Sequence, residues 1–285
     1  MIARTVTVIA ALTLREALRK RVVWALVGLT VLLLALSGWG FAELANAQSS
    51  TGQLTSGQER LAASQVLNLV MFGMSLIAAL GTAFLAGPTL GGEIESGVAH
   101  AMLARPIRRT SVLAGKWLGL ALFGSAYIAV AGLAQFLVVK ATADYWPPQP
   151  ALALALLSLQ TIVLLTLALL LSTLISPLAS GIVAVGLFGA TWVAGVVGGI
   201  GAVLDNDAVA RIGDISRVLL PTDGLWRGAM HAIQDPTSLL QFGRAGEGFP
   251  FLSPTGITGL YLAWVVLWVM AVGLVCATSF ARRDL

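Results

Sequence analysis

The residues that could do chemistry gather in one short polar segment, residues 91–110, which lies between two apolar stretches. Glu93 and Glu95 come first, a short apolar run follows, and an Arg-Pro pair with two further arginines closes the segment. Acids at the start of a helix and bases at its end favour the helix dipole, and a proline stops the helix. This order predicts a short helix. An ordinary loop whose arginines only fix membrane topology would also fit.

Bond-making chemistry is not indicated elsewhere in the chain. His100 and His231 are the only histidines and Cys276 is the only cysteine, so a disulfide within the chain and a cysteine metal cluster are both excluded. Gly115-Lys116 matches part of a phosphate-binding loop, but Trp117 follows where that motif needs serine or threonine. We therefore expect a protein that is not an enzyme, binds no metal or cofactor of its own and does not hydrolyse ATP by itself.

The elements that position this segment are apolar. The chain is 58% hydrophobic and 11% charged with a mean hydropathy of +0.90, whereas soluble proteins carry about a quarter charged residues. Crossing a bilayer takes roughly 20 helical residues, and continuous apolar runs in lipid form helices. The sequence predicts an all-α integral membrane protein, a single transmembrane domain over residues 1–285, with six spans at 22–40, 65–90, 117–139, 151–175, 178–204 and 257–280.

The basic residues predict the orientation. The termini and the connection between the second and third spans hold 11 of the 17 lysines and arginines, namely Arg4, Arg15, Arg19, Lys20, Arg21, Arg105, Arg108, Arg109, Lys116, Arg282 and Arg283. The short connections on the other side hold Arg60 and Lys140. Short basic loops stay inside, which predicts a multi-pass protein of the cytoplasmic membrane with both termini cytoplasmic. The same distribution explains the net charge of +4 without a nucleic-acid partner.

Three connecting regions have their own patterns. Residues 1–21 mix apolar and basic positions, which predicts an interfacial helix in the headgroup plane, although a simple basic anchor would also fit. Ala45-Asn46-Ala47 resembles a signal-peptide cleavage site, but the apolar run before it is span-length. Residues 41–64 are small and polar and predict an external loop. Residues 205–254 predict an extracytoplasmic segment of short helices resting on the outer surface. No span contains an ionisable residue, which disfavours an ion-coupled transporter.

The segment from Glu93 to Gly119 resembles the type-2 ABC exporter permease family. The elements of the resemblance, in order, are Gly92-Glu93, Glu95-Ser96-Gly97, Met102-Leu103, Pro106-Ile107-Arg108-Arg109 and Gly115-Lys116. Val98 departs from it, because many members have threonine there. Pro221-Thr222-Asp223 is also similar to permeases of nitrous-oxide reductase maturation clusters.

The resemblance implies that residues 91–110 form a cytoplasmic coupling helix between spans two and three, seated on a separate ABC ATPase subunit. The residues implied in this contact are Glu93, Glu95, Gly97, His100, Arg105, Pro106, Arg108 and Arg109. ATP and Mg²⁺ would bind to that partner subunit, and a second permease copy, expected to be identical, would complete a dimer among membrane lipids. The implied function is ATP-driven export by alternating access. A membrane scaffold or a passive channel that docks a soluble partner is the alternative.

Overall fold

The structure is a computed structural model that describes residues 2–51, 56–92, 108–236 and 250–282. Within those ranges every regular element is helical. The helices are α1 (Ile2–Arg19), α2 (Arg21–Thr51), α3 (Ser56–Gly87), the π turn η1 (Pro88–Gly92), α6 (Arg109–Ala143), α7 (Pro150–Leu174), α8 (Pro177–Val203), α9 (Asp207–Leu219), α10 (Thr222–Ile233) and α12 (Gly259–Arg282).

Six of these helices, α2, α3, α6, α7, α8 and α12, are long and apolar enough to cross a membrane. Each of the six apolar stretches in the sequence lies on one of them. The prediction of an all-α integral membrane protein with six spans is therefore confirmed. The expected coupling helix falls almost wholly on residues 93–107, which lie outside the described residues.

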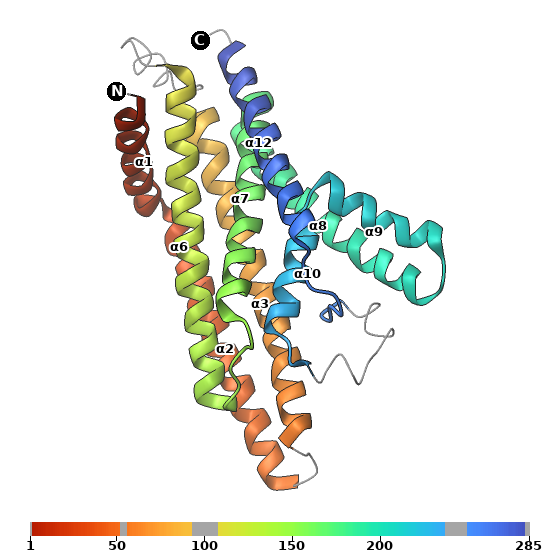
Figure 1. Ribbon diagram of the computed structural model, residues 1–285. Coiled ribbons are helices and arrows are strands. Elements are labelled where there is room, and N and C mark those ends of the chain that lie inside the picture. The colour runs from red at the N-terminus through yellow and green to blue at the C-terminus, as the bar shows by residue number, and fades with distance from the viewer. Residues whose placement is uncertain (1, 52–55, 93–107, 237–249, 283–285) are drawn as a thin grey trace.

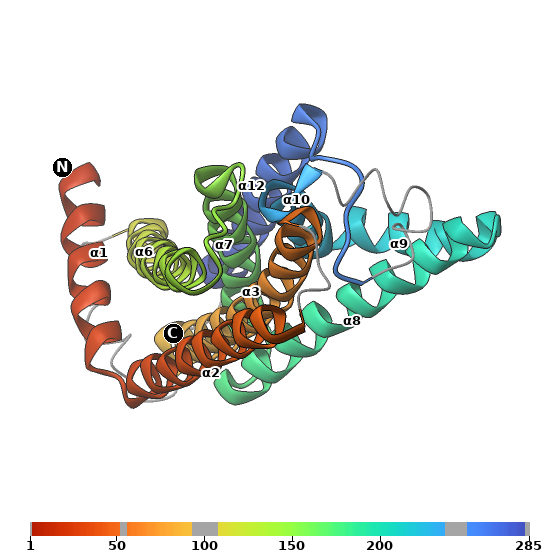
Figure 2. The same ribbon diagram turned by 90° about the horizontal axis from the view of Figure 1, so that it is seen from below.

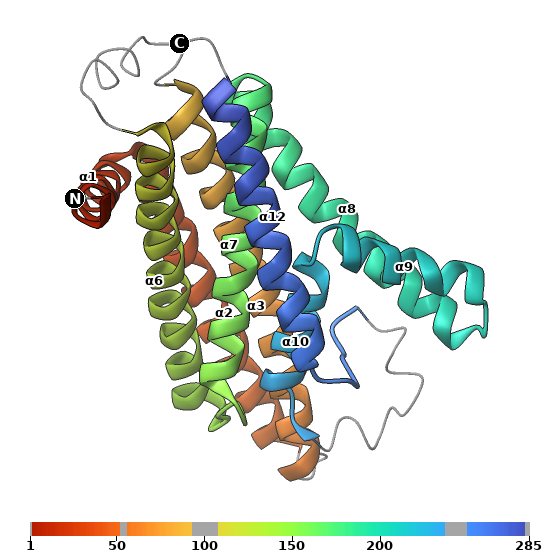
Figure 3. The ribbon, with the colours of Figure 1, turned by 45° about the horizontal axis from the view of Figure 1, so that its top comes forward.

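The long helices stand side by side in a bundle, as Figure 1 shows. The end of α3, the start of α6 and the end of α12 lie at one end of the bundle, beside α1, and we call this the terminal end (Figure 1). Seen along the bundle, α1 runs across it and turns into α2 at a corner (Figure 2). The later part of α8 and its neighbour α9 project from the bundle as an arm (Figure 3).

Two expectations for the connections were wrong. The loop expected over residues 41–64 is largely helical, because α2 continues to Thr51 and α3 begins at Ser56. Alanine, leucine, glutamate and glutamine in this region are good helix formers, so the helices extend past the apolar stretches. In addition, α10 does not rest on the outer surface. It packs against α7 and α8, and Trp226 and Met230 on it are almost completely buried.

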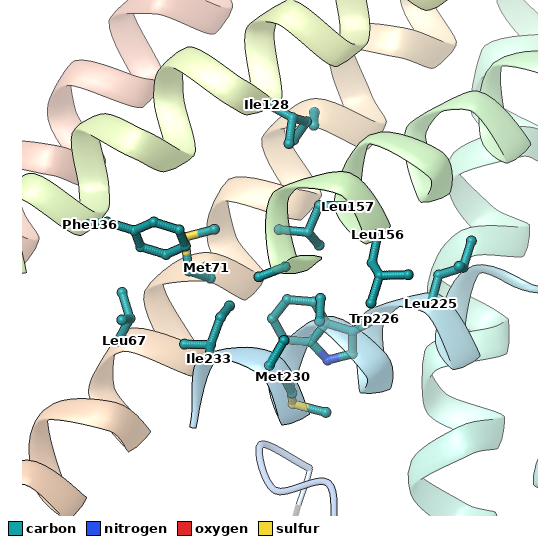
Figure 4. Packing of buried hydrophobic residues seen from close by; sticks show 14 of the residues in the cluster. Leu67, Met71, Ile128, Phe136, Leu156, Leu157, Leu225, Trp226, Met230 and Ile233 are labelled. Atoms are coloured by element: carbon teal, nitrogen blue, oxygen red, sulfur yellow. The ribbon is translucent and has the colours of Figure 1, made fainter. Parts of the chain in front are cut away.

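The main hydrophobic core explains the position of α10. Figure 4 shows Trp226 and Met230 of α10 among side chains of α3, α6 and α7, including Met71, Phe136 and Leu157. Burying a large aromatic side chain contributes on the order of 1.5–3 kcal/mol, and α10 carries several apolar residues at helical spacing. Its apolar face therefore belongs inside the bundle.

Polar side chains join the long helices at several points. Ser37 of α2 donates to Gln135 Oε1 of α6 at 3.0 Å, and Ser75 of α3 donates to Gln160 Oε1 of α7 at 3.1 Å. Such bonds between spans satisfy polar groups that lipid would leave without a partner. The glutamines that interrupt the apolar stretches thus connect helices.

Candidate coupling site at the terminal end

Only the last two of the predicted coupling residues can be placed. Glu93, Glu95, Gly97, His100, Arg105 and Pro106 lie outside the described residues. Arg108 is exposed and caps α6 in an extended conformation, and its carbonyl oxygen accepts from the backbone N–H of Ser111 at 2.9 Å. Arg109 Nη1 donates to the carbonyl oxygen of Ala281 at 3.2 Å. Arg109 therefore connects the start of α6 to the end of α12.

The predicted coupling segment follows a distorted helix end. Helix α3 finishes in the π turn η1, which begins at Pro88. Proline has no N–H to donate and its ring crowds the carbonyl oxygen of the preceding turn, so a regular α-helical turn is disfavoured here. Short π segments within helices occur often at functional sites. The last described residue before the gap is Gly92, at the end of this turn.

Two lysines, Lys116 of α6 and Lys20 between α1 and α2, converge on Thr89 in the π turn. Lys116 of α6 donates from Nζ to the backbone carbonyl oxygen of Thr89 at 2.6 Å, and Lys20 donates to Thr89 Oγ1 at 3.2 Å. The Thr89 hydroxyl donates in turn to the carbonyl oxygen of Leu85. Lys20 also forms a 3.0 Å ion pair with Glu16 of α1. Cations at the C-terminal end of α3 favour its dipole. The π turn is thereby attached to α6 and to the junction of α1 and α2.

Helix α1 packs closely on α6 because two glycines leave room for it. A methyl group added at Gly115 would lie 2.7 Å from Ile9 Cβ, and one added at Gly119 would lie 2.6 Å from the carbonyl oxygen of Ala10. Neither position could hold a side chain without moving α1. Gly115 and Gly119 are therefore packing sites, and the helix that packs on them is α1.

A second polar cluster lies away from the terminal end, around Asp223 of α10. Arg217 Nε and Arg227 Nε both donate to Asp223 Oδ2, at 3.0 and 3.1 Å, and the Asp223 side chain is only 1% exposed. Arg227 also donates to the carbonyl oxygen of Gly195 at 2.7 Å, and Tyr261 donates to the carbonyl oxygen of Arg217 at 3.1 Å. One buried carboxylate thus holds α8, α9, α10 and α12 together.

Both clusters contain residues to which sequence reasoning gave no such role. Lys116 figured only as a topology marker and as part of the Gly-Lys motif, yet its side chain is 3% exposed inside the protein. Asp223 belonged to a short motif without any assigned contact. The only sequence signal for Lys116 was its position directly before an apolar stretch, and no sequence pattern indicated that Asp223 packs against Gly195.

The geometry defines a polytopic helical membrane protein whose polar contacts at the terminal end join helices around one segment. The chain matches the family model described as ABC-2 family transporter protein over residues 7–285 and belongs to that family. It is therefore a membrane permease subunit of an ABC transporter, and the family implies a partner ABC ATPase subunit. No curated protein matches the chain in sequence.

Proposed function

We propose that this permease serves an ATP-driven exporter and that residues 91–110 couple it to the ATPase subunit. The observation that carries the proposal is the convergence of Lys116 and Lys20 on Thr89, four residues before Glu93. A displacement of the segment would move the π turn. The hydrogen bonds of the two lysines to Thr89 would then transmit this movement to α6 and to the α1–α2 junction. Arg109, bonded to Ala281 at the other side of the segment, would pass it to α12.

In this proposal the partner subunit supplies the energy. ATP and Mg²⁺ bind there, and ATP binding favours one conformation of the whole complex through its differential affinity for two states. The acidic start and basic end of residues 91–110 suit a salt-dependent polar contact. Rigid-body movement of the permease then follows, as in other switching assemblies.

Two further features of the proposal concern assembly and orientation. A second, identical permease would form the other wall of the substrate path, because α10 and its neighbours fill the interior of one bundle with side chains. Both termini would be cytoplasmic in the cytoplasmic membrane. Arg15, Arg19, Arg21 and Arg282 at the terminal end are exposed there, as the positive-inside rule requires.

The first test is purification of tagged protein from its native host in mild detergent, followed by mass spectrometry. Recovery of an ATPase subunit in a fixed ratio to the permease would support the proposal. Its reproducible absence from intact permease would contradict it and would favour a scaffold or a passive channel.

The second test addresses the coupling role. Glu95→Lys reverses a charge at the start of the predicted coupling helix and should uncouple ATP hydrolysis from transport, while membrane insertion stays intact. Glu59→Lys, at the exposed start of α3, is the matched control because it makes the same charge change elsewhere on the chain. Equal transport and ATPase binding by the Glu95→Lys variant and the native protein would contradict the role.

A further inference from the structure

An apolar groove of about 490 Å³ runs between α1, α2 and α6. Its walls include Leu14 and Leu18 of α1, Val27 and Leu34 of α2, and Val130 of α6. Several of these side chains are well exposed, with 53% of Leu18 and 71% of Val130 accessible. The groove therefore presents an open apolar surface on the flank of the bundle.

The polar groups in the groove do not call for a polar ligand. Thr30 and Tyr127 line it, and their hydroxyl groups are bonded to each other. Because Thr30 donates to the carbonyl oxygen of Leu26 at 2.7 Å, the Tyr127 hydroxyl donates to Thr30. Both hydroxyl hydrogens are thus used within the protein, and the floor of the groove suits a hydrocarbon chain.

Three arginines, which we call the arginine rim, stand next to groove residues in the sequence or at the junction of α1 and α2. Arg15 and Arg19 follow the groove residues Leu14 and Leu18 on α1, one helical turn apart, and Arg21 begins α2. All three arginines are exposed, and within the described ranges no ion pair involves any of them. Lys20, in contrast, is engaged by Glu16 and Thr89. The rim thus offers three guanidinium groups to an external anion.

The arrangement of the helices places the apolar groove and the arginine rim next to each other, as the acyl chain and the phosphate of a lipid require. Helix α1 lies across the bundle and meets α2 at its corner (Figure 2), whereas the groove continues from α1 along α2 and α6. Guanidinium groups bind phosphate through paired hydrogen bonds, and basic pockets beside membrane helices bind acidic lipid headgroups. We propose that the groove is a binding site for an anionic phospholipid, with the phosphate at the arginine rim and one acyl chain in the groove.

Charge favours a lipid over a second copy of the chain in this groove. In a two-fold contact both copies use the same surface patch, so a dimer through this groove would bring the arginines of both rims into one interface. Like charges placed together weaken such a contact. The proposal goes beyond transport and does not depend on which side of the membrane α1 faces.

The test uses the full chain purified in mild detergent, with added phosphatidylglycerol or phosphatidylcholine, and native mass spectrometry of the retained lipid. The native protein should retain phosphatidylglycerol in preference to phosphatidylcholine. The triple variant Arg15→Gln/Arg19→Gln/Arg21→Gln should lose roughly a hundredfold in phosphatidylglycerol affinity, because each of the three basic residues near a headgroup contributes about fivefold. Arg211→Gln, an exposed arginine of α9, should leave the affinity unchanged. Equal retention by the triple variant and the native protein would overturn the proposal.

A second pair of variants tests the groove with the rim intact. Ala126→Trp fills the groove, and Ala129→Trp is the control because Ala129 is exposed on the same helix but does not line it. Ala126→Trp should reduce the retention of both lipids, with unfolding midpoints in the same detergent confirming that both variants fold. Retention equal to that of Ala129→Trp would contradict the site. A disulfide-linked dimer formed by Val130→Cys in a Cys276→Ser background would assign the groove to a second copy and also overturn the proposal.

Discussion

The Nζ atom of Lys116 lies 2.6 Å from the backbone carbonyl oxygen of Thr89, and this contact joins the start of α6 to the π turn that ends α3. The two residues flank the predicted coupling segment, so they close a loop around it. The Lys116 side chain is 3% exposed, and hydrogen bonds made by a charged group away from water are stronger than neutral ones. The contact thus fixes both ends of the segment in relation to each other.

Lys116→Met should destabilise the protein, because it removes the charged donor and leaves the Thr89 carbonyl oxygen without it. Hydrogen bonds to charged groups contribute about 1.5–3 kcal/mol, and we expect a loss within that range. The measurement is the unfolding midpoint of purified protein titrated with a denaturing detergent. Lys116→Arg keeps a donor and should recover part of the loss. If the Met variant were as stable as the native protein, the contact would make no contribution to stability.

Asp223→Asn should be more damaging, because it leaves Arg217 and Arg227 without the carboxylate that they share. Removing one partner of a buried ion pair costs about 3–5 kcal/mol; since both arginines are partly exposed, we expect the lower end of that range. The same denaturation experiment measures it. Asp214→Asn is the matched control, because Asp214 also pairs with Arg217 but is 72% exposed, and its effect should be a small fraction of that of Asp223→Asn. Similar effects of the two variants would count against the cluster.

Gly119→Ala should separate α1 from α6, because the added methyl group would lie 2.6 Å from the carbonyl oxygen of Ala10. Overpacking of this kind costs about 1–3 kcal/mol. Gly28→Ala places the same methyl group on α2, where no atom lies within 4 Å, and should be neutral or slightly stabilising. Limited proteolysis at the arginines of α1 would report its release. Equal cleavage of the two variants would argue against close packing of α1.

Tyr145→Phe tests a contact in the connection between α6 and α7. The Tyr145 hydroxyl donates to the carbonyl oxygen of Ile233 at 2.7 Å, and the variant should lose about 1 kcal/mol at neutral pH. Burial, aided by Asp235, raises the pKa of Tyr145 above its ordinary 10.0.

A raised pKa sets the sign of the pH dependence. The stabilisation by Tyr145 is complete below pH 10 and declines as the pH rises from there towards the higher folded-state pKa, because the unfolded chain ionises first. The stability difference between the native protein and Tyr145→Phe should therefore shrink between pH 9 and pH 11. A constant difference over that interval would contradict the raised pKa of Tyr145 and hence the burial of its hydroxyl group.

The fold class could be predicted from the sequence because lipid leaves few choices. Each long apolar run has to be a helix, and all six spans were found in this way. Helix ends were predicted less well, because hydropathy shows where the chain leaves the lipid and not where the helix ends. Alanine and glutamate beyond the apolar stretch continue α2 to Thr51. The burial of α10 was missed because an amphipathic helix can pack either on the membrane surface or inside a bundle, and only the position of α10 beside α3 and α7 shows that Trp226 turns inward.

The candidate site was predicted only as a segment. The order of acids and bases over residues 91–110 indicated a short helix, the family resemblance implied its contact with an ATPase subunit, and the family match confirms the family alone. The pairing of Lys116 with Thr89 joins residues 27 positions apart, so it depends on how α3 and α6 stand together. The same holds for Asp223, whose partners come from two helices.

The filling of the bundle by α10 determines which surfaces a transported molecule can meet. Trp226, Met71 and Phe136 belong to one buried hydrophobic cluster inside one copy, so side chains fill this part of the bundle. A genetic screen for altered cargo would then collect its changes on the outward faces of the helices. Changes on the inward faces would instead be recovered as losses of expression. The two classes of mutation would thus distinguish the outward faces of the helices from the packed interior.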